Sequence, residues 1–216
     1  MKFNKLTIFP GSELALPGQI LCSLLKVAVL ILALSGQIQA REVLHGQVMK
    51  QGEVFSTWFE VSLNAPAANV RKVLSDMNQL VPLLPDVKTY DIKHGSRRNA
   101  EVEMVMETCV LILCKEFVQK QRFYISKNGT LKGRFVESGS DFETGDSYYE
   151  VVEDRNGIRL RFVSNLEPKF WVPFGEQRLT NCLMDYAQKL AIAIEQHVQS
   201  QFMHAARKKQ GLEKPA

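Results

Sequence analysis

The chain has 216 residues, of which 45% are hydrophobic, and its formal net charge at pH 7 is +4. This length supports one sizeable core and leaves little room for a second complete domain. The bases are scattered among acids, and no run of lysine or arginine alternates with stacking aromatics. The composition therefore argues against a nucleic-acid partner.

Residues 1–40 have the pattern of a secretory signal peptide. Three lysines supply positive charge, an uninterrupted apolar run occupies 27–34, and small and polar residues lead to Ala40. We expect cleavage after Ala40 and a periplasmic location for the mature protein. A retained anchor is the alternative, but Lys26 breaks the apolar segment, which falls short of the roughly 20 residues of a spanning helix.

The mature chain opens with a predicted strand and two short helices. At 53–63 every second residue is apolar or threonine, as in a half-buried strand. The sequence Asn-Ala-Pro at 64–66 ends this strand and begins a helix. Apolar residues recur at helical spacing over 70–77, and Pro82 and Pro85 interrupt the apolar stretch that follows. Two helices in series fit this pattern better than one.

About six antiparallel strands are predicted after Pro85. The stretch 100–125 contains no Gly, Pro, Asn or Asp, yet typical strands have about 3 to 10 residues. A hairpin turn must therefore lie inside this stretch, and we place it at 110–113. Asn-Gly pairs at 128–129 and 156–157 predict two further hairpins.

The last predicted element is a long helix from about Gly175 to Ala205. Apolar residues recur along it at steps of three and four, which gives one continuous stripe. At about 1.5 Å per residue the helix is long enough to cross a whole sheet. We predict one α+β domain at 41–206 with the order β-α-α-β6-α, a curved antiparallel sheet of about seven strands, and a disordered tail at 207–216.

Two segments resemble the START-like superfamily and its helix-grip fold. One is VSLNAPAANVRKVLSD at 61–76 with LLPDV at 83–87, and the other is PKFWVPFG at 168–175. Within the superfamily the chain is most similar, over about 47–201, to the coenzyme Q-binding and polyketide cyclase/dehydrase branch. The resemblance implies a hydrophobic cavity for lipids, quinones or polycyclic compounds, and it carries over no universal catalytic residue.

A candidate cavity follows from the predicted architecture, because a bent sheet cannot pack flush against a straight helix along its whole length. Met104 and Met106 share a strand face with Val102, and their thioethers could line such a space, although a stripe of this kind is also typical of ordinary core. The candidate lining residues are Val102, Met104, Met106, Phe117, Phe123, Phe135, Leu160, Phe162, Trp171, Phe174, Leu183, Tyr186 and Leu190.

Aromatic and cysteine residues mark two further features. Phe170, Trp171 and Phe174 could gate the cavity or touch a membrane surface, and the alternative is that they close the end of the sheet as core. Cys109 and Cys114 could form a disulfide across the predicted turn, but in one continuous strand they would point to opposite faces. With the turn in place, its apolar tip becomes a candidate for transient membrane contact.

Catalytic and metal-binding patterns are absent from the sequence. The four histidines lie far apart, and no H-E-x-x-H, P-loop or G-x-S-x-G motif occurs, so we expect no metal and no cofactor. We predict a monomeric periplasmic binding or carrier protein for a hydrophobic small molecule, without catalysis. Two alternatives remain: an aromatase/cyclase-like enzyme acting on a polyketide-type substrate, and a protein-interaction module.

Overall fold

A computed structural model describes residues 43–96, 99–110, 113–126, 129–172 and 175–209 of the chain. The predicted signal segment and its cleavage site at 1–40, the candidate Phe174 and the tail from residue 210 lie outside the described residues. Within the described part, no helix is long and apolar enough to span a bilayer.

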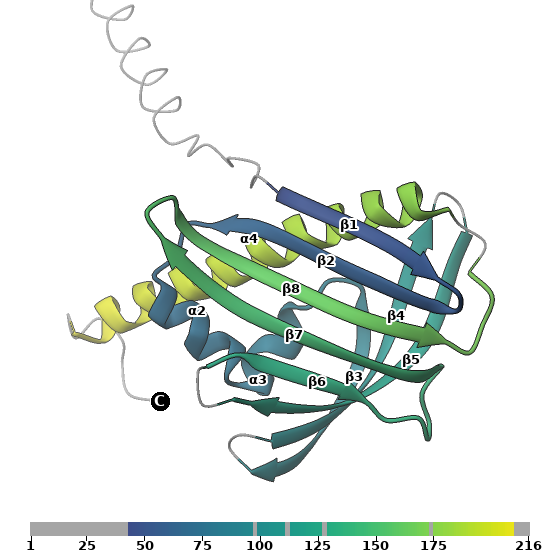
Figure 1. The fold of residues 1–216 in the computed structure, drawn as a ribbon. Coiled ribbons are helices and arrows are strands. Elements are labelled where there is room, and N and C mark those ends of the chain that lie inside the picture. Colours follow the sequence, from purple (N-terminus) through teal and green to yellow (C-terminus); the bar gives the residue numbers. More distant parts are fainter. Residues whose placement is uncertain (1–42, 97–98, 111–112, 127–128, 173–174, 210–216) are drawn as a thin grey trace, which may run out of the picture. The chain divides into compact units, whose positions relative to one another are not determined.

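The described strands form one antiparallel sheet of eight, in the order β1-β2-β8-β7-β6-β5-β4-β3 (Figure 1). Strands β3 to β8 pair in sequence order, and β8 then pairs with β2, which is far from it in the sequence. The strands are β1 Val43–Gln51, β2 Val54–Leu63, β3 Val87–Ser96, β4 Asn99–Val110, β5 Leu113–Ile125, β6 Leu131–Phe135, β7 Phe142–Asp154 and β8 Gly157–Pro168.

The sheet has one strand more than the sequence predicts. The extra strand, β1, lies at an edge, and its only buried side chain is Val48, so it lacks the alternation that reveals a half-buried strand. Backbone pairing with β2 and side chains of the C-terminal helix hold it in place. The predicted turn inside 100–125 lies where expected, since β4 ends at Val110 and β5 begins at Leu113.

Short helices in series follow β2, as predicted, but the break between the first two lies before the prolines. They are α2 Ala67–Leu74, α3 Met77–Leu80 and the 3-10 turn η1 Val81–Leu83, which contains Pro82. Asp76 separates α2 from α3, and its carboxylate accepts a hydrogen bond from the backbone N–H of Asn78 at 3.1 Å. Val70, Val73 and Leu74 of α2 are buried in the main core.

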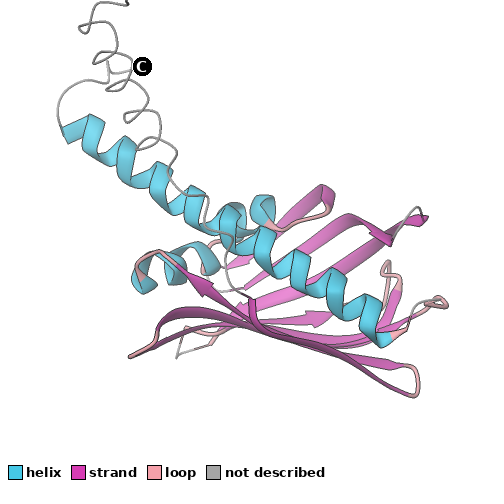
Figure 2. Ribbon diagram, turned by 90° about the horizontal axis from the view of Figure 1, so that it is seen from above, coloured by secondary structure: helices cyan, strands magenta, loops and turns pink. Residues whose placement is uncertain are grey.

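The long helix α4, Glu176–Lys209, lies across the concave side of the sheet (Figure 2). Its N-terminal half is fixed to the edge strand: the backbone N–H of Val48 donates to Thr180 Oγ1 at 3.0 Å. A Cβ at Gly46 would stand 2.9 Å from Met184 Cγ, so glycine permits this close approach. The helix continues three residues into the predicted tail at 207–216, which corrects that boundary.

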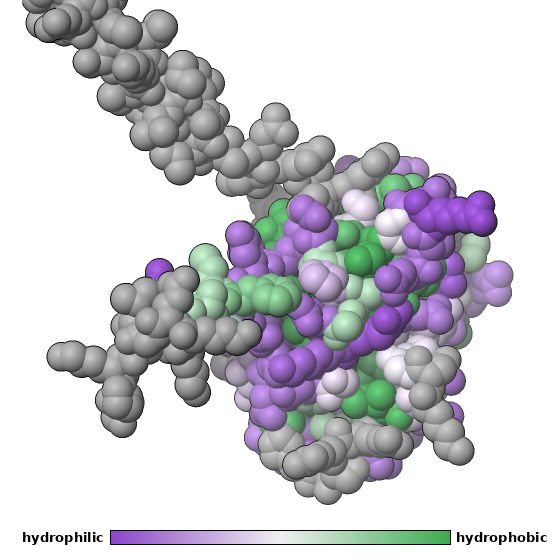
Figure 3. Space-filling model, turned by 90° about the vertical axis from the view of Figure 1, so that its left-hand side faces the viewer, coloured by the Kyte–Doolittle hydropathy of each residue, from purple (hydrophilic) through white to green (hydrophobic). Residues whose placement is uncertain are grey.

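The C-terminal turns of α4 extend beyond the sheet, where Phe202 and Met203 are each 53% exposed. Figure 3 shows the molecule from this end, and hydrophilic side chains in purple separate several smaller hydrophobic areas in green. The loop at 169–172, which joins β8 to α4, lies at the opposite end of the sheet (Figure 1).

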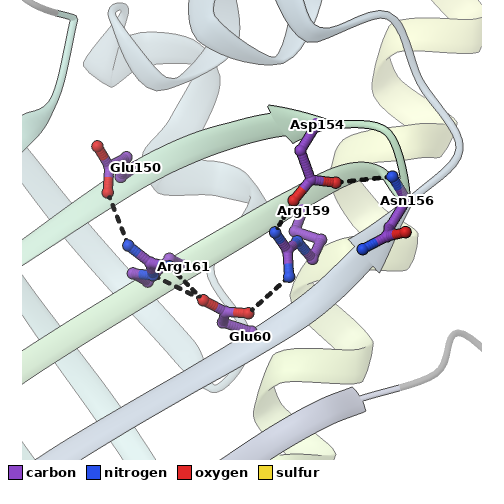
Figure 4. A network of polar contacts seen from close by, with 6 residues as sticks. All are labelled: Glu60, Glu150, Asp154, Asn156, Arg159 and Arg161. Atoms are coloured by element: carbon purple, nitrogen blue, oxygen red, sulfur yellow. Dashed lines mark hydrogen bonds and ion pairs between the residues drawn. The ribbon is translucent and has the colours of Figure 1, made fainter.

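The convex side of the sheet carries a charged network across β2, β8 and β7 (Figure 4). Glu60 is 6% exposed and accepts hydrogen bonds from Arg161 Nε at 2.7 Å and from Arg159 at 3.3 Å. Arg161 also pairs with Glu150, and Arg159 with Asp154. Register places Arg161 opposite both Glu60 and Glu150, so the three strands are cross-linked by charge on the face away from α4.

Candidate functional site

A cavity of about 280 Å³ lies between the concave face of the sheet and the first half of α4. Strands β2, β4, β5, β6, β7 and β8 contribute to its floor, and Leu179, Cys182, Leu183 and Tyr186 of α4 form its roof. At the α2 end the same interface is solid core. The predicted space between helix and sheet therefore exists.

The structure brings seven of the predicted lining residues together around this cavity. They are Met104, Met106, Phe123, Phe135, Phe162, Leu183 and Tyr186.

The other predicted lining residues lie elsewhere. Val102, Leu160 and Leu190 are fully buried in the neighbouring core, because each lies further along its strand or helix than the cavity extends. Phe117 packs edge-on against Phe142, with ring centroids 5.6 Å apart, outside the lining.

Trp171 is 80% exposed and does not line the cavity, while its neighbours Phe170 and Val172 do. The aromatic side chains of the loop at 169–172 therefore point in different directions. The ring of Phe170 packs on the cavity wall, and the indole of Trp171 faces outward. Lys115 Nζ lies 3.5 Å from the centroid of the Phe170 ring, a cation–π contact that holds this part of the loop against β5.

The floor of the cavity is deepened by a row of small residues that runs straight across the sheet. Thr57 of β2 is opposite Ser164 of β8, Ser164 is opposite Ser147 of β7, and Ser147 is opposite Gly133 of β6. A Cβ at Gly133 would come within 2.7 Å of Ser147 Oγ. Short side chains at Thr57, Ser147 and Ser164 leave the volume that α4 does not fill, and Gly133 makes room for the side chains of Gln121 and Phe123.

Aromatic rings close the cavity on the α2 side of this row. The ring of Phe162 stacks on Phe59 with centroids 5.1 Å apart and contacts Tyr149 at 4.6 Å. Tyr186 reaches down from α4 and lies 6.4 Å from Phe59, centroid to centroid.

The hydroxyls of Tyr149 and Tyr186 share a hydrogen bond at this end. Burial raises the pKa of Tyr149 to about 12, although the bond to Tyr186 opposes the rise. Burial raises the pKa of Tyr186 well above its usual 10.0, and the nearby Tyr149 and Asp86 add to the rise. Both phenols therefore stay protonated at neutral pH and act as hydrogen-bonding groups.

Two glutamines were missed by the sequence analysis. Gln119 and Gln121 of β5 line the cavity between Phe117 and Phe123, with which they share a strand face. Gln121 is 3% exposed, and its Oε1 accepts a hydrogen bond from Ser147 Oγ at 3.5 Å. The parity of Phe117 and Phe123 could have revealed both amides, because every second residue of a strand points to the same side.

Asp86 lies at the rim, between the cavity and a neighbouring hollow that Lys88, Glu107, Asp185 and Lys189 also line. Its φ is 65°, and its carbonyl accepts a hydrogen bond from Glu107 N at 2.9 Å. Partial burial raises the pKa of the Asp86 carboxyl, the charges of Asp185 and Glu107 raise it further, and Lys189 opposes them.

Replacing Asp86 with asparagine is expected to raise the midpoint of thermal unfolding at pH 7. A raised pKa in the folded state means that the carboxylate destabilises the fold above that pKa, and the penalty disappears as pH falls below the ordinary value of 3.8. Asparagine also tolerates the positive φ. Thermal scans from pH 3 to pH 7 check this, with Asp91→Asn on exposed β3 as the control; a lower midpoint for Asp86→Asn at pH 7 would contradict it.

The cysteines are placed as follows. Cys114 is disulfide-bonded, and Cys109 is its register partner across the β4–β5 hairpin. Cys182 is a free thiol that lines the cavity from α4. Within the described residues, no group of three or more His, Cys, Asp or Glu is arranged to hold a metal ion.

Solved structures with the same architecture are known. A protein from Thermus thermophilus superimposes with a TM-score of 0.54 at 14% identity, covering 68% of this chain and 98% of its own. A START superfamily protein from Mycobacterium smegmatis gives 0.50 at 16% identity, with coverage of 68% and 98%. The di-domain aromatase/cyclase BexL from the BE-7585A biosynthetic pathway gives 0.51 at 12% identity, with coverage of 84% and 60%.

These likenesses confirm the predicted fold. The chain has the helix-grip α+β fold of START-like proteins, with eight strands where about seven were expected. At identities of 16% and below, the comparison shows the fold alone. No protein-family model matches the sequence, and neither does any curated protein.

Proposed function

We propose that this protein binds and carries a hydrophobic small molecule in the cavity between the sheet and α4. The observation that carries the proposal is the cavity itself, about 280 Å³ enclosed largely by aromatic, aliphatic and methionine side chains. Burial of apolar ligand surface would supply affinity at about 25 cal/mol per Å², before the costs of ordering. Lipids, quinones and polycyclic compounds are the candidate ligands.

Extraction of the purified protein with organic solvent, followed by mass spectrometry, tests this proposal. We expect a specific apolar compound to co-purify in near-stoichiometric amount and to be absent from a parallel extract of a Leu183→Trp variant, in which the indole occupies the cavity. Repeated extracts without such a compound, together with no uptake of a fluorescent lipid or quinone, would contradict it.

An aromatase/cyclase-like enzyme is the second candidate, and Asp86 is the observation that favours it. A carboxyl with a raised pKa at the cavity rim is a group that could move a proton. Binding is the better-supported function. The pKa values of Tyr149 and Tyr186 are raised further from neutral pH, which makes both phenols poor proton-transfer groups, and Asp86 is exposed. Faster ring closure of a linear poly-β-ketone thioester by the wild type, lost in Asp86→Asn, would favour the enzyme.

Export to the periplasm is part of the proposal. The lysines and apolar run at 1–40 support it, and so does the disulfide-bonded Cys114, since disulfides persist in oxidising compartments. N-terminal sequencing of protein recovered from the periplasmic fraction is expected to begin at Arg41. Recovery from the cytoplasm with Met1 intact would contradict this.

Transient contact with a membrane surface would let the carrier collect an apolar ligand, and Trp171 is the residue best placed for it. Its indole is 80% exposed beside two residues that line the cavity, and tryptophan favours the bilayer interface. We expect Trp171→Ala to reduce cosedimentation with phosphatidylethanolamine/phosphatidylglycerol vesicles several-fold. Tyr124→Ala, which removes an exposed ring from β5, is the control, and an equal loss in both variants would contradict the prediction.

A further inference from the structure

We propose that the ligand carries a hydroxyl group, recognised by a polar belt that consists of Thr57, Ser147, Ser164 and Gln121. This inference rests on the proposed function and specifies the chemistry of the same cavity. All four side chains line it, and three of them are at most 4% exposed: Gln121, Ser147 and Ser164. Polar groups buried in an otherwise apolar cavity cost free energy unless they are hydrogen-bonded.

The belt lies well inside the cavity. Pro168, Leu166, Ser164 and Phe162 occupy alternate positions of β8 and all line the cavity. At about 3.3 Å per residue, Ser164 lies roughly 13 Å along the strand from Pro168, where the chain enters the exposed loop. A ligand hydroxyl at the belt would therefore lie deep in the cavity, with the apolar side chains of Leu166 and Pro168 between it and the loop.

The hydroxyl protons of the belt already have acceptors in the protein. Ser164 Oγ donates to the carbonyl of Asp146 at 3.0 Å, and Thr57 Oγ1 donates to the carbonyl of Ser164 at 3.4 Å. Ser147 Oγ donates to Gln121 Oε1 at 3.5 Å. A hydroxyl has one proton and two acceptor lone pairs, so these three side chains present acceptors to a ligand. An O–H donor on the ligand is the complementary group.

Gln121 complements this arrangement. Its amide oxygen accepts from Ser147, and the amide NH₂ group supplies donors for the oxygen of a ligand hydroxyl. The floor beside the belt is aromatic: Phe55 lies toward the loop, Phe135 is opposite Gln121, and Phe162 lies toward the closed end. The cavity volume of about 280 Å³ lies just below the roughly 300–1,000 Å³ typical of ligand pockets, which favours a compact ring compound.

Three naphthalenes that differ in one substituent test the inference by titration calorimetry with the mature protein. We expect 2-naphthol to bind roughly three- to tenfold more tightly than 2-methylnaphthalene, the gain typical of one or two hydrogen bonds. We expect 2-methoxynaphthalene, which has the oxygen but no proton to donate, to bind more weakly than 2-naphthol. The preference should shrink in a Ser147→Ala/Ser164→Ala variant and in Gln121→Leu.

Ser56→Ala is the matched control, because its hydroxyl lies on the convex face of β2 and donates to Asn165 Oδ1 at 2.8 Å. Equal affinity for all three compounds would overturn the hydroxyl inference and leave the proposed function standing. The same holds if the preference survives in a folded Ser147→Ala/Ser164→Ala or Gln121→Leu variant. Binding of none of the compounds would contradict the proposed function, and this inference with it.

Discussion

Replacing Leu183 with tryptophan is expected to weaken binding of the apolar probe N-phenyl-1-naphthylamine at least tenfold. Leu183 lies in the roof of the cavity, midway along the lining part of α4, so the larger indole would occupy the space left for a ligand. Overpacking of this kind costs about 1 to 3 kcal/mol of stability, which the fold should tolerate. Fluorescence titration of the probe measures the effect.

Gln196→Trp provides the control for this variant, because it introduces the same residue at an exposed position of the same helix. Its probe binding should equal that of the wild type. Thermal unfolding of both variants separates a filled cavity from a failure to fold. A cooperatively folded Leu183→Trp protein with unchanged affinity would show that the probe binds somewhere else.

The largest stability effect is expected at Glu60, on the opposite side of the sheet. Glu60→Leu should lower the free energy of unfolding by about 2 to 3 kcal/mol, because it removes the shared partner of Arg159 and Arg161. The loss falls below that of a fully buried pair because Arg161 is 38% exposed and keeps Glu150. Arg159 already has a buried Nε without a partner among the described residues, so removal of the Glu60 carboxylate would leave its guanidinium with still fewer hydrogen bonds.

Glu143→Leu is the comparison for this experiment, since it removes one carboxylate from an exposed position of β7. Its effect in urea denaturation should stay within about 0.5 kcal/mol. Equal losses of unfolding free energy in the two variants would mean that the ion pairs in Figure 4 stabilise the fold no more than a single exposed carboxylate does.

Periodicity in the sequence was sufficient to predict most of the architecture. The stripe of α4, the short helices in series after β2 and the hidden β4–β5 turn all follow from local spacing, and the structure has them, although the break between the first two helices lies at Asp76 and not at Pro82. β1 could not be found in this way, because an edge strand with one buried side chain has no pattern to detect. Its position depends on hydrogen bonds to β2 and α4, which are distant in the sequence.

The site was harder to predict than the fold. Alternation identifies which residues face inward, and Met104, Phe123 and Phe162 were assigned to the correct side for that reason. Alternation does not show how far along a strand the core ends and the cavity begins, so Val102 and Leu160 were placed in the wrong part of the same face. That boundary depends on the angle between α4 and the bent sheet.

The polar lining was missed for a related reason. Serines and glutamines in a strand are typical of a solvent-exposed face, and Ser147 and Ser164 meet only through pairing between β7 and β8. Their alignment with Gly133 is a property of register across three strands. No short segment of sequence contains it.

A crystal structure of the mature protein grown with 2-naphthol would test the central claim most directly. We predict ligand density between Leu183 of α4 and Phe162 of β8, with the naphthol oxygen near Ser147 and Ser164. Density at another place on the protein, or side chains that fill the space between helix and sheet, would contradict the account.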